Sequence, residues 1–546
     1  MNLPVQFQPA PAEHIPLLSR RKSLIRTNAS APRHRVRLRR TGAHDQRAAR
    51  GIVRRFSTSL FLACAVAAVV TGCRVGPDYR TPKAAVPGGY TSLGIAALSS
   101  VTNSVAPDPL ASWWTLFNDP TLESLIAEAA AANHDLRLAQ ARVREARAVR
   151  GSVRSSLFPQ MDAAGAYQRS RTSGNTYQGD LLEAAVAGLT QDGYNTGFDL
   201  NWEIDVFGGN RRGVEAAQAN LQASEDNANG TLISVLAEVG LGYLDLRGLQ
   251  KQLSVARDNL HAQQQTLALT QDRMQAGLSG ELDSARAESQ VAATAALIPP
   301  LEQGILRAQH RLALLLGKAP GELAGRFGAE SPIPSAARAV PVGLPSELLQ
   351  RRPDIRRAER ELAAATARIG VATAELFPKF YLTGAAGLQS IEAEDFLESG
   401  SRFWSLGPSV RWPIFSAGQI RQKIRVENAR QEQTLIRYEQ TVLKSLEEVE
   451  NALVGFGKEQ ERHRELVRSE VAGRRAVALA TDQFRSGLVD FLNVLEAERS
   501  LYAAQQELAI SERMLSQNAV RLYQALGGGW QEAAASKTLA SAPVAK

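Results

Sequence analysis

Hydrophobic and polar residues alternate along two segments of the chain. From Tyr194 to Val206 the even positions are apolar apart from one threonine, and the odd positions are Gly, Asn or an acid. The alternation returns from Trp404 to Ile414, and residues 161–167 and 380–388 alternate more weakly, with Gly and Ala. A period of two residues is that of a β-strand. The sequence therefore predicts two hairpins, with strands at about 160–170, 194–206, 380–390 and 404–414.

The segments that follow each hairpin have a helical period instead. In the first, apolar residues recur three and four positions apart, as in packed coiled helices: Leu232, Val235, Leu236, Val239, Tyr243, Leu246, Leu249 and Leu253. No proline occurs between Gly208 and Ile298 or between Ile414 and Ala542. Gly208 to Ala276, 69 residues, would extend about 100 Å as one helix. Turns at 277–280 and 487–490 are predicted to fold each long helix back on a partner.

The chain contains an internal repeat. Two motifs of the first half return 219 positions later, Asp135-Leu136-Arg137 as Asp354-Ile355-Arg356 and Leu157-Phe158-Pro159 as Leu376-Phe377-Pro378. Two more return 210 positions later, Trp202 as Trp412 and Asp272–Leu278 as Asp482–Leu488. The offset falls by nine, so the first copy has the longer loop, at 170–193. Two copies of helix, strand, loop, strand, helix, turn, helix make up nearly the whole chain.

Four strands with one apolar side cannot close a barrel by themselves. Thirteen alternating residues extend about 43 Å, which is ample for a tilted membrane strand. Five aromatic residues could form an interfacial girdle: Tyr167, Tyr194, Trp202, Trp404 and Trp412. An amphipathic sheet packed on helices is the alternative. Alternation places Asp199, Glu203 and Asp205 on the side that faces water.

The net charge of +8 is confined to one end of the chain. The first 60 residues carry 13 Lys and Arg against two acids, which leaves the remainder with 50 basic and 53 acidic residues. The body of the protein is therefore slightly acidic, and nucleic acid is not an expected partner.

A signal peptide with an acylation site ends the basic leader. Arg55 is followed by 17 uncharged residues and then Cys73, and the apolar core, Leu60–Val70, is too short to span a membrane. Val70-Thr71-Gly72-Cys73 resembles the bacterial lipobox, so Cys73 is expected to carry a diacylglycerol and an N-acyl lipid. The alternative is an incidental cysteine beside an ordinary signal peptide. Cleavage before Cys73 leaves 474 residues. The resemblance to lipoproteins implies that Arg74 in the second mature position, rather than Asp, favours transfer to the outer membrane. Translation is hypothesised to start at a non-AUG codon downstream of Met1.

The residue inventory excludes familiar enzyme classes. Seven scattered histidines show no His-Glu-x-x-His spacing, and neither a Gly-Lys-Ser/Thr phosphate loop nor Gly-x-Ser-x-Gly occurs. Two cysteines exclude a Cys-based metal cluster. We expect no enzymatic activity, no metal and no cofactor other than the covalent lipid.

Several motifs after Cys73 resemble those of TolC-like outer membrane factors of tripartite efflux systems, in the lipoprotein branch called NodT-type. They are Gly76-Pro77-Asp78-Tyr79, Trp113-Trp114, Phe117-Asn118-Asp119-Pro120, the run Leu344–Arg356 (LPSELLQRRPDIR) and Trp412–Gly418 (WPIFSAG). The resemblance implies a mainly α protein with a membrane β-barrel part. Each protomer would give four strands to a trimeric twelve-stranded barrel, and its helical hairpins would build a periplasmic α-barrel.

The resemblance also divides the chain into regions. They are a leader and lipoprotein signal peptide (1–72), a lipidated N-terminal segment and belt region (73–134), the first efflux repeat (135–316), a belt linker (317–350), the second repeat (351–526) and a flexible C-terminal tail (527–546). The tip that meets the adaptor is assigned to Gly277, Leu278, Gly487 and Leu488. The periplasmic gate is assigned to Asp283, Leu492, Asn493 and Glu496. Asn493 departs from the family's acidic pattern, and Phe484 from a tip tyrosine.

The expected function is that of a passive outer membrane channel that exports small molecules such as drugs from a Gram-negative cell. Its expected partners are two further copies of the chain, a periplasmic membrane-fusion adaptor, an inner membrane pump of the RND type and outer membrane lipid. The alternatives are a channel for type I protein secretion and a periplasmic coiled-coil scaffold without a pore.

Overall fold

A computed structural model describes residues 74–94, 110–171, 173, 190–328, 331–335 and 345–531. All of them belong to the compact unit Thr71–Lys546, and the leader and Cys73 lie outside the described residues. Among the described residues, no helix has both the length and the apolar character needed to cross a membrane.

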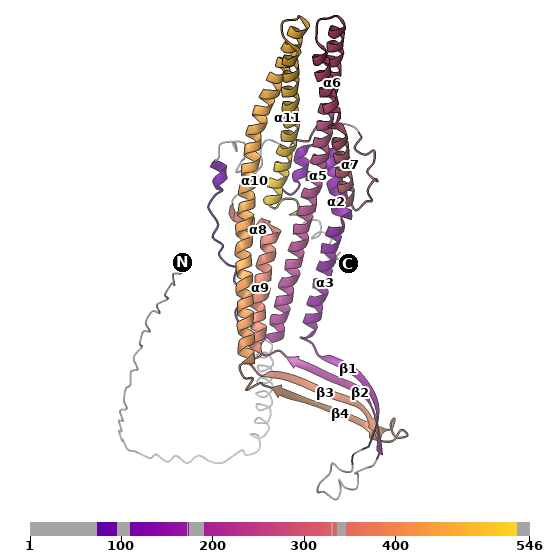
Figure 1. Cartoon of the computed structure of the whole chain (residues 1–546). Coiled ribbons are helices and arrows are strands. Elements are labelled where there is room, and N and C mark those ends of the chain that lie inside the picture. The colour runs from indigo at the N-terminus through magenta and orange to yellow at the C-terminus, as the bar shows by residue number, and fades with distance from the viewer. Residues whose placement is uncertain are drawn as a thin grey trace, which may run out of the picture. The chain divides into compact units, whose positions relative to one another are not determined.

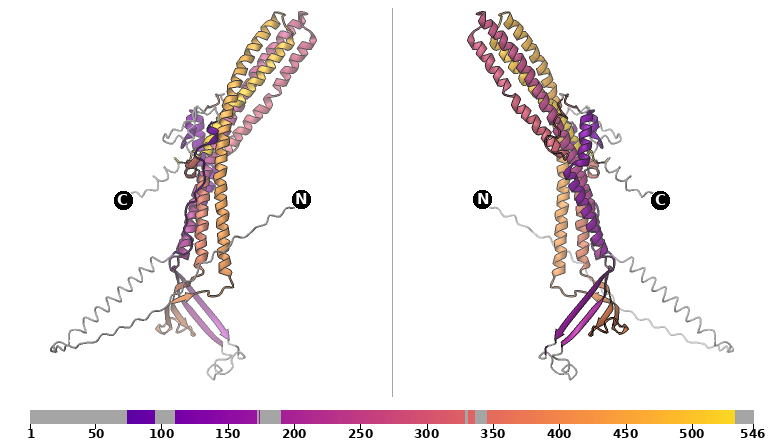
Figure 2. Two further views of the ribbon diagram at one scale, coloured as in Figure 1. Left: turned by 90° about the vertical axis from the view of Figure 1, so that its left-hand side faces the viewer. Right: turned by 90° about the vertical axis from the view of Figure 1, so that its right-hand side faces the viewer.

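Two helices of 67 residues each dominate the structure, α5 (Gly209–Gln275) and α10 (Gln419–Arg485). Both run from the sheet to the opposite end of the unit (Figure 1). Each begins after a left-handed glycine, Gly208 with φ 78° and Gly418 with φ 83°. The side views show the long helices changing direction near the middle (Figure 2). The predicted pair of long helices is confirmed.

Shorter helices accompany each half of the long pair. Beside the sheet-proximal half lie α3 (His134–Ser155) on α5, and α9 (Pro353–Ala374) between α5 and α10. Toward the free end, α6 (Glu281–Ala295) and α7 (Ile298–Leu315) pack on α5, and α11 (Phe491–Ala525) packs on both long helices. The middle carries α2 (Pro120–Ala132), α8 (Pro345–Arg351) and the 3-10 helices η1 (Thr91–Gly94) and η2 (Trp113–Phe117).

The hydrophobic core lies at this middle level. The Trp113 ring stacks on the Tyr523 ring, with centroids 5.9 Å apart, and both side chains are buried. A Cβ at Gly240 of α5 would lie 2.8 Å from the Trp113 ring, so only glycine permits this approach. The periodic leucines of α5 from Leu232 to Leu246 are buried against this cluster, which confirms the packing that their spacing predicted.

Four antiparallel strands form one sheet in the order β1-β2-β3-β4. They are β1 (Gln160–Arg171), β2 (Thr190–Ile204), β3 (Lys379–Ser390) and β4 (Arg402–Arg411), with the 3-10 turn η3 (Ser399–Ser401) before β4. Gln160 pairs with Asn201 in the first hairpin and Lys379 with Arg411 in the second. Lys379 follows Gln160 by 219 positions and Arg411 follows Asn201 by 210, which are the offsets of the sequence repeat. The two hairpins therefore have the same register.

The ends of two strands differ from the prediction. β2 stops at Ile204 because Asp205 turns to accept the backbone N–H groups of Asn210 and Arg211, at 3.2 and 2.8 Å. Asp205 therefore caps α5 and also pairs with the Arg211 guanidinium, instead of facing water as predicted. β4 stops at Arg411, before Pro413, which has no N–H to donate to a ladder.

A tryptophan closes each hairpin at the junction with the helices. Trp202 Nε1–H donates to the Leu157 carbonyl at 3.1 Å, and Trp412 Nε1–H donates to the Leu376 carbonyl at 3.0 Å. Both carbonyls belong to the repeated Leu-Phe-Pro motif. The second strand of each hairpin is therefore tied to the start of the first.

The region assigned to the C-terminal tail begins with packed residues. Trp530 is buried, and its Nε1–H donates to the Arg351 carbonyl at 3.0 Å. The described chain ends at Gln531.

Candidate channel sites

The sheet has one apolar and one polar face. The strand registers place these apolar side chains on one face: Met161, Tyr167, Phe198, Leu200, Leu382, Leu388, Trp404, Leu406 and Val410. The opposite face carries Asp162, Asp199, Asn201, Thr383, Ser405 and Ser409. No described helix covers either face of the sheet, which extends beyond the helix ends (Figure 1). This excludes the alternative of an amphipathic sheet packed on helices.

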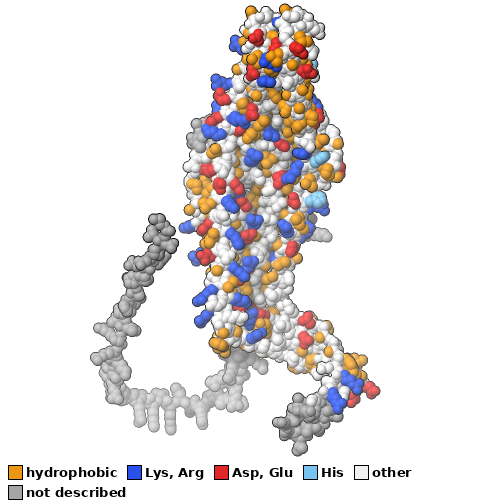
Figure 3. All heavy atoms as spheres, viewed as in Figure 1, with side chains coloured by type: hydrophobic (Ala, Val, Ile, Leu, Met, Phe, Trp, Pro, Cys, Tyr) orange, Lys and Arg blue, Asp and Glu red, His pale blue; other side chains and the backbone are white. Residues whose placement is uncertain are grey.

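The two turns at the free end are built alike. Gly277 has φ 73° and Gly487 φ 74°, and the following Leu278 and Leu488 donate N–H to the carbonyls of Arg273 and Gln483 at 2.8 and 2.9 Å. This is the Schellman arrangement, which glycine favours because the residue after the helix is left-handed. The two leucine side chains, 66% and 75% exposed, stand at the extreme end. Acidic, basic and apolar side chains all reach the surface there (Figure 3).

A small separate core holds the two hairpins together below these turns. It consists of Ala287, Phe484, Phe491, Val494 and Leu495. Phe484 is buried with its ring 5.8 Å from that of Phe491. Apolar packing therefore surrounds the position where the resemblance implied a tyrosine.

Arg273 of α5 links the two hairpins at the same level. Its guanidinium lies 4.7 Å from the centroid of the Phe484 ring, and its Nη1 donates to the Arg485 carbonyl at 3.2 Å. That carbonyl lies at the C-terminus of α10, where the helix dipole favours a cation. Sequence reasoning missed Arg273, because the repeat places glutamine at the matching position 483.

The four residues assigned to the gate lie just beyond the turns. Leu492 and Glu496 are exposed one turn apart on α11, and Asn493 Nδ2 donates to the Asp490 carbonyl at 3.4 Å. Asp283 of α6 accepts the Ser279 hydroxyl at 2.9 Å. Its other oxygen lies 3.9 Å from Arg286, and Glu496 lies 3.7 Å from Arg499. Asp283 sits on the other hairpin from the remaining three.

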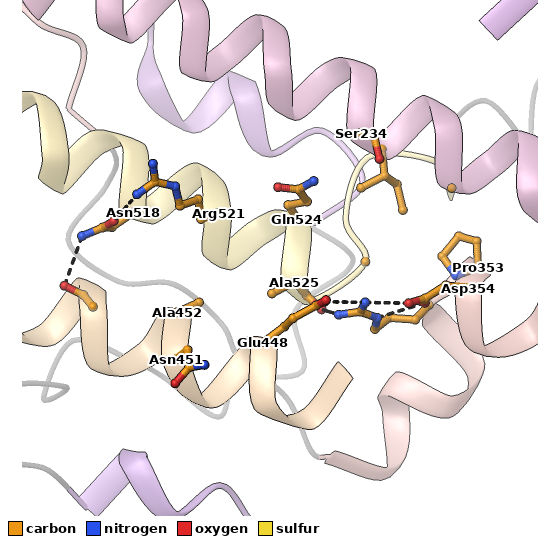
Figure 4. Close-up of a pocket in the computed structure, with 15 residues that line it drawn as sticks. Ser234, Pro353, Asp354, Glu448, Asn451, Ala452, Asn518, Arg521, Gln524 and Ala525 are labelled. Atoms are coloured by element: carbon orange, nitrogen blue, oxygen red, sulfur yellow. Dashed lines mark hydrogen bonds and ion pairs between the residues drawn. The ribbon is translucent and has the colours of Figure 1, made fainter. Parts of the chain in front are cut away.

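A cavity of about 600 Å³ lies farther down, between α5, α9, α10 and α11. Asp354, Glu448 and Ala525 converge at one end, and Asn518 and Arg521 lie at the other (Figure 4). The sequence contained Arg352 in a family motif but gave it no role. The structure makes it the centre of the first group: its guanidinium donates to both Asp354 oxygens, at 3.0 and 2.7 Å, to Glu448 at 2.6 Å and to the Ala525 carbonyl at 2.8 Å.

The electrostatics of this cavity centre on the Arg352 guanidinium. Burial lowers the pKa of Arg352, but the hydrogen bonds and charges of Asp354 and Glu448 outweigh it and raise that pKa overall. The guanidinium is therefore held as a cation. Within the described part of the chain, no group of three His, Cys, Asp or Glu side chains is placed to hold a metal ion.

Comparison with known proteins matches this architecture. The sequence profile of the family "Outer membrane efflux protein" matches residues 125–318 and 344–528. Nodulation protein T of Rhizobium leguminosarum bv. trifolii is 31% identical over 85% of this chain and 96% of its own length. Toluene efflux pump outer membrane protein TtgF of Pseudomonas putida is 32% identical over 86% of this chain and 97% of its own. The solved structure of the outer-membrane channel OprN is 39% identical and covers 84% of this chain and all of its own, with a TM-score of 0.77. The resemblance read from the motifs is confirmed, and the chain belongs to the outer membrane efflux protein family.

Proposed function

We propose that this protein is the outer membrane channel of a tripartite efflux system, a trimeric conduit for small molecules. The four-stranded sheet carries the proposal, because no described residue covers its apolar face and, in the described part of the chain, each edge strand, β1 and β4, pairs on one side only. Unpaired backbone groups cost several kcal/mol each in lipid, so strands there must close into a barrel. Three copies would supply twelve strands.

The proposed partners at the other end are a periplasmic membrane-fusion adaptor and an inner membrane pump of the RND type. Leu278 and Leu488 expose apolar side chains at the ends of the two hairpins, as a docking surface would. The similarity to an efflux pump outer membrane protein supports pump-driven export of small molecules over protein secretion.

The proposed entrance is formed by Asp283, Leu492, Asn493 and Glu496, which threefold symmetry would repeat as rings. Glu496 is exposed and its Arg499 partner lies 3.7 Å away, whereas Asp283 also accepts the Ser279 hydroxyl. We therefore expect Glu496 to attract cations more strongly than Asp283 does. The exposed Leu492 would restrict the opening by dewetting.

A lipid on Cys73 is proposed to anchor the chain beside the sheet. The first described residues lie at the junction of sheet and helices, where Val75 N–H donates to the Phe207 carbonyl at 3.2 Å. Arg212, which is buried, donates to the Val75 carbonyl at 3.2 Å and pairs with Asp78 at 2.7 Å. This fixed segment would hold the acyl chains at the membrane boundary. Cys73→Ser should abolish acyl labelling of the mature chain.

Single-channel recording of the purified full chain in planar bilayers tests the proposal. Discrete conductance steps are expected, and their complete absence would favour a scaffold without a pore. Glu496→Gln should reduce cation preference, read from the reversal potential in a salt gradient. Glu465→Gln is the matched control, since Glu465 is an exposed α10 carboxylate paired with Arg468. If the two variants behave alike, the assignment of the entrance is wrong.

A further inference from the structure

The contact between the two hairpins toward the free end carries a row of polar bonds between α5 and α11. Arg513 donates to Asp245 at 2.6 Å, and Gln506 donates to the Gln252 carbonyl at 3.2 Å. Nearer the turns, Asn259 donates to Gln505 at 2.8 Å and the Thr266 hydroxyl donates to Glu498 at 2.7 Å. The α5 members are seven positions apart, which is the repeat of a coiled contact. We call this row the polar seam.

The two acids of the polar seam differ in their partners. Asp245 forms an ion pair with Arg513. Glu498 is half-buried and accepts the Thr266 hydroxyl, but it forms an ion pair with none of the described Lys, Arg or His side chains. A carboxylate that is partly removed from water and has no counter-charge is costly to keep ionised.

The charged side chains around Glu498 are engaged elsewhere or contribute no bond to it. Arg474 of α10 pairs with Glu470, and Arg499 donates to Gln290 of α6 at 2.8 Å and lies 3.7 Å from Glu496. Arg273 of α5 contacts the Phe484 ring and the Arg485 carbonyl. The other charged or titratable groups that α5, α6 and α10 carry at this level are His261, Asp272, Arg286, Glu288, Arg475 and Asp482.

A second uncompensated group lies in the same part of the polar seam. Gln263 stands on α5 between Asn259 and Thr266 and is 3% exposed. Neither its amide nitrogen nor its amide oxygen has a hydrogen-bond partner among the described residues. A buried polar group left without a partner costs about 1 to 3 kcal/mol. The seam therefore combines an unpaired amide with a carboxylate that lacks a counter-charge.

We propose that Glu498 is a proton-dependent latch between the two hairpins. The neutral carboxyl accepts the Thr266 hydroxyl and adds an O–H donor to a seam in which Gln263 has an unpaired acceptor. The ionised carboxylate loses that donor and places a charge between the helices, so the hairpins separate more easily. The effect on conductance rests on the proposed function, whereas the effect on the seam does not.

The direction of the pH dependence follows from the environment of the carboxyl group. Burial raises the pKa of Glu498, and the Thr266 hydrogen bond opposes this only in part. The joined hairpins therefore bind the proton more tightly than separated ones do. The stability that the proton provides is fully present below about pH 4 and is lost as the pH rises through the raised pKa.

Hydrogen exchange of the full-length, detergent-solubilised chain, followed by mass spectrometry over residues 259–270 and 495–506, tests the latch. Comparing variants at one pH cancels the intrinsic pH dependence of exchange. Glu498→Gln keeps a neutral acceptor for Thr266, so the seam should exchange more slowly than in the unmodified chain at about pH 8 and equally at about pH 4. The expected slowing is about tenfold for each unit by which the joined state raises the pKa.

Two further variants separate protonation from general packing. Glu465→Gln is the matched control and should change nothing, because Glu465 is exposed on α10 and paired with Arg468. Thr266→Val removes the hydrogen bond that favours the ionised form, so the pH at which the seam loosens should move upward. Equal or faster exchange in Glu498→Gln at about pH 8 overturns the latch.

Planar-bilayer recording relates the latch to the proposed entrance. Conductance of the unmodified chain should rise between about pH 4 and pH 8, and Glu498→Gln should remove that rise. A seam that responds to pH beside a conductance that does not overturns the effect on the entrance but leaves the latch. Absence of conductance steps in every sample overturns the proposed function, while the exchange result still decides the latch.

Discussion

The Arg352 side chain joins three helices that the chain order keeps far apart. It is 9% exposed and sits at the start of α9, bonded to both oxygens of Asp354, to Glu448 of α10 and to the carbonyl of Ala525, the last residue of α11. That carbonyl is one of the helix-end groups without a partner inside the helix. Arg352→Ala should therefore destabilise the packing of α9, α10 and α11 against one another.

The expected cost follows from what the substitution leaves behind. Asp354 and Glu448 are 38% and 56% exposed and can rehydrate, so their lost bonds are discounted for solvent screening. The Ala525 carbonyl is buried with the residue, and an orphaned buried acceptor costs about 1 to 3 kcal/mol. Because the two carboxylates add little, we expect Arg352→Ala to reduce the free energy of unfolding by about 1 to 3 kcal/mol.

The neighbouring arginine supplies a matched control. Arg351 makes one ion pair with Glu347, one helical turn away at 3.2 Å, and both side chains are 36% exposed. Exposed pairs of this kind contribute at most about 0.5 kcal/mol. Thermal melting of the detergent-solubilised full chain, at one scan rate because such unfolding is commonly irreversible, should show a large drop for Arg352→Ala and almost none for Arg351→Ala. Equal shifts of the melting temperature would refute the claim that Arg352 stabilises the contact between α9, α10 and α11.

Two further predictions concern the α5–α9 boundary and the hairpin closures. Burial raises the pKa of Asp226 to about 6 despite its pair with Arg356. The pKa of Asp226 is higher in the folded chain than in the unfolded chain, so the folded state binds the proton more tightly. The stability that this proton provides is fully present below about pH 4 and is lost as the pH rises through 6. Asp226→Asn should then raise stability at pH 8 by up to about 3 kcal/mol and have no effect near pH 4, measured by melting; destabilisation at pH 8 would mean that the ion pair dominates. Trp202→Phe removes the bond to the Leu157 carbonyl and should cost about 1 kcal/mol by the same assay, and more than Trp412→Phe, whose indole is over half exposed. A smaller effect for Trp202 than for Trp412 would contradict the burial argument.

The proposed entrance combines polar side chains with a link between the two hairpins. Asn493 donates its side-chain N–H to the Asp490 carbonyl, and Asp283 accepts a hydrogen bond from the Ser279 hydroxyl. Arg273 and Phe484 connect the two hairpins across their ends. We therefore expect any restriction at this end to depend on packing as well as on charge.

Local patterns determined the type and the approximate bounds of the main helices and strands. The period-two segment at β2 and the proline-free runs of α5 and α10 act through neighbours along the chain, and this is why their type and approximate bounds were predictable. The sequence offsets of 219 and 210 predicted that the two hairpins are equivalent. The paired residues of the two hairpins differ by the same offsets.

Only the tertiary structure decided which charged side chains bond to groups of other helices. Arg352 meets the Ala525 carbonyl 173 positions away, and Arg273 meets the Arg485 carbonyl 212 positions away. No periodicity encodes such pairs, because a long polar side chain bonds whichever acceptor the packed helices bring within reach. Asp205 shows the same limit at short range: alternation placed it on a strand, but the start of α5 offered two unpaired N–H groups, and these bonds outweighed one more residue of strand.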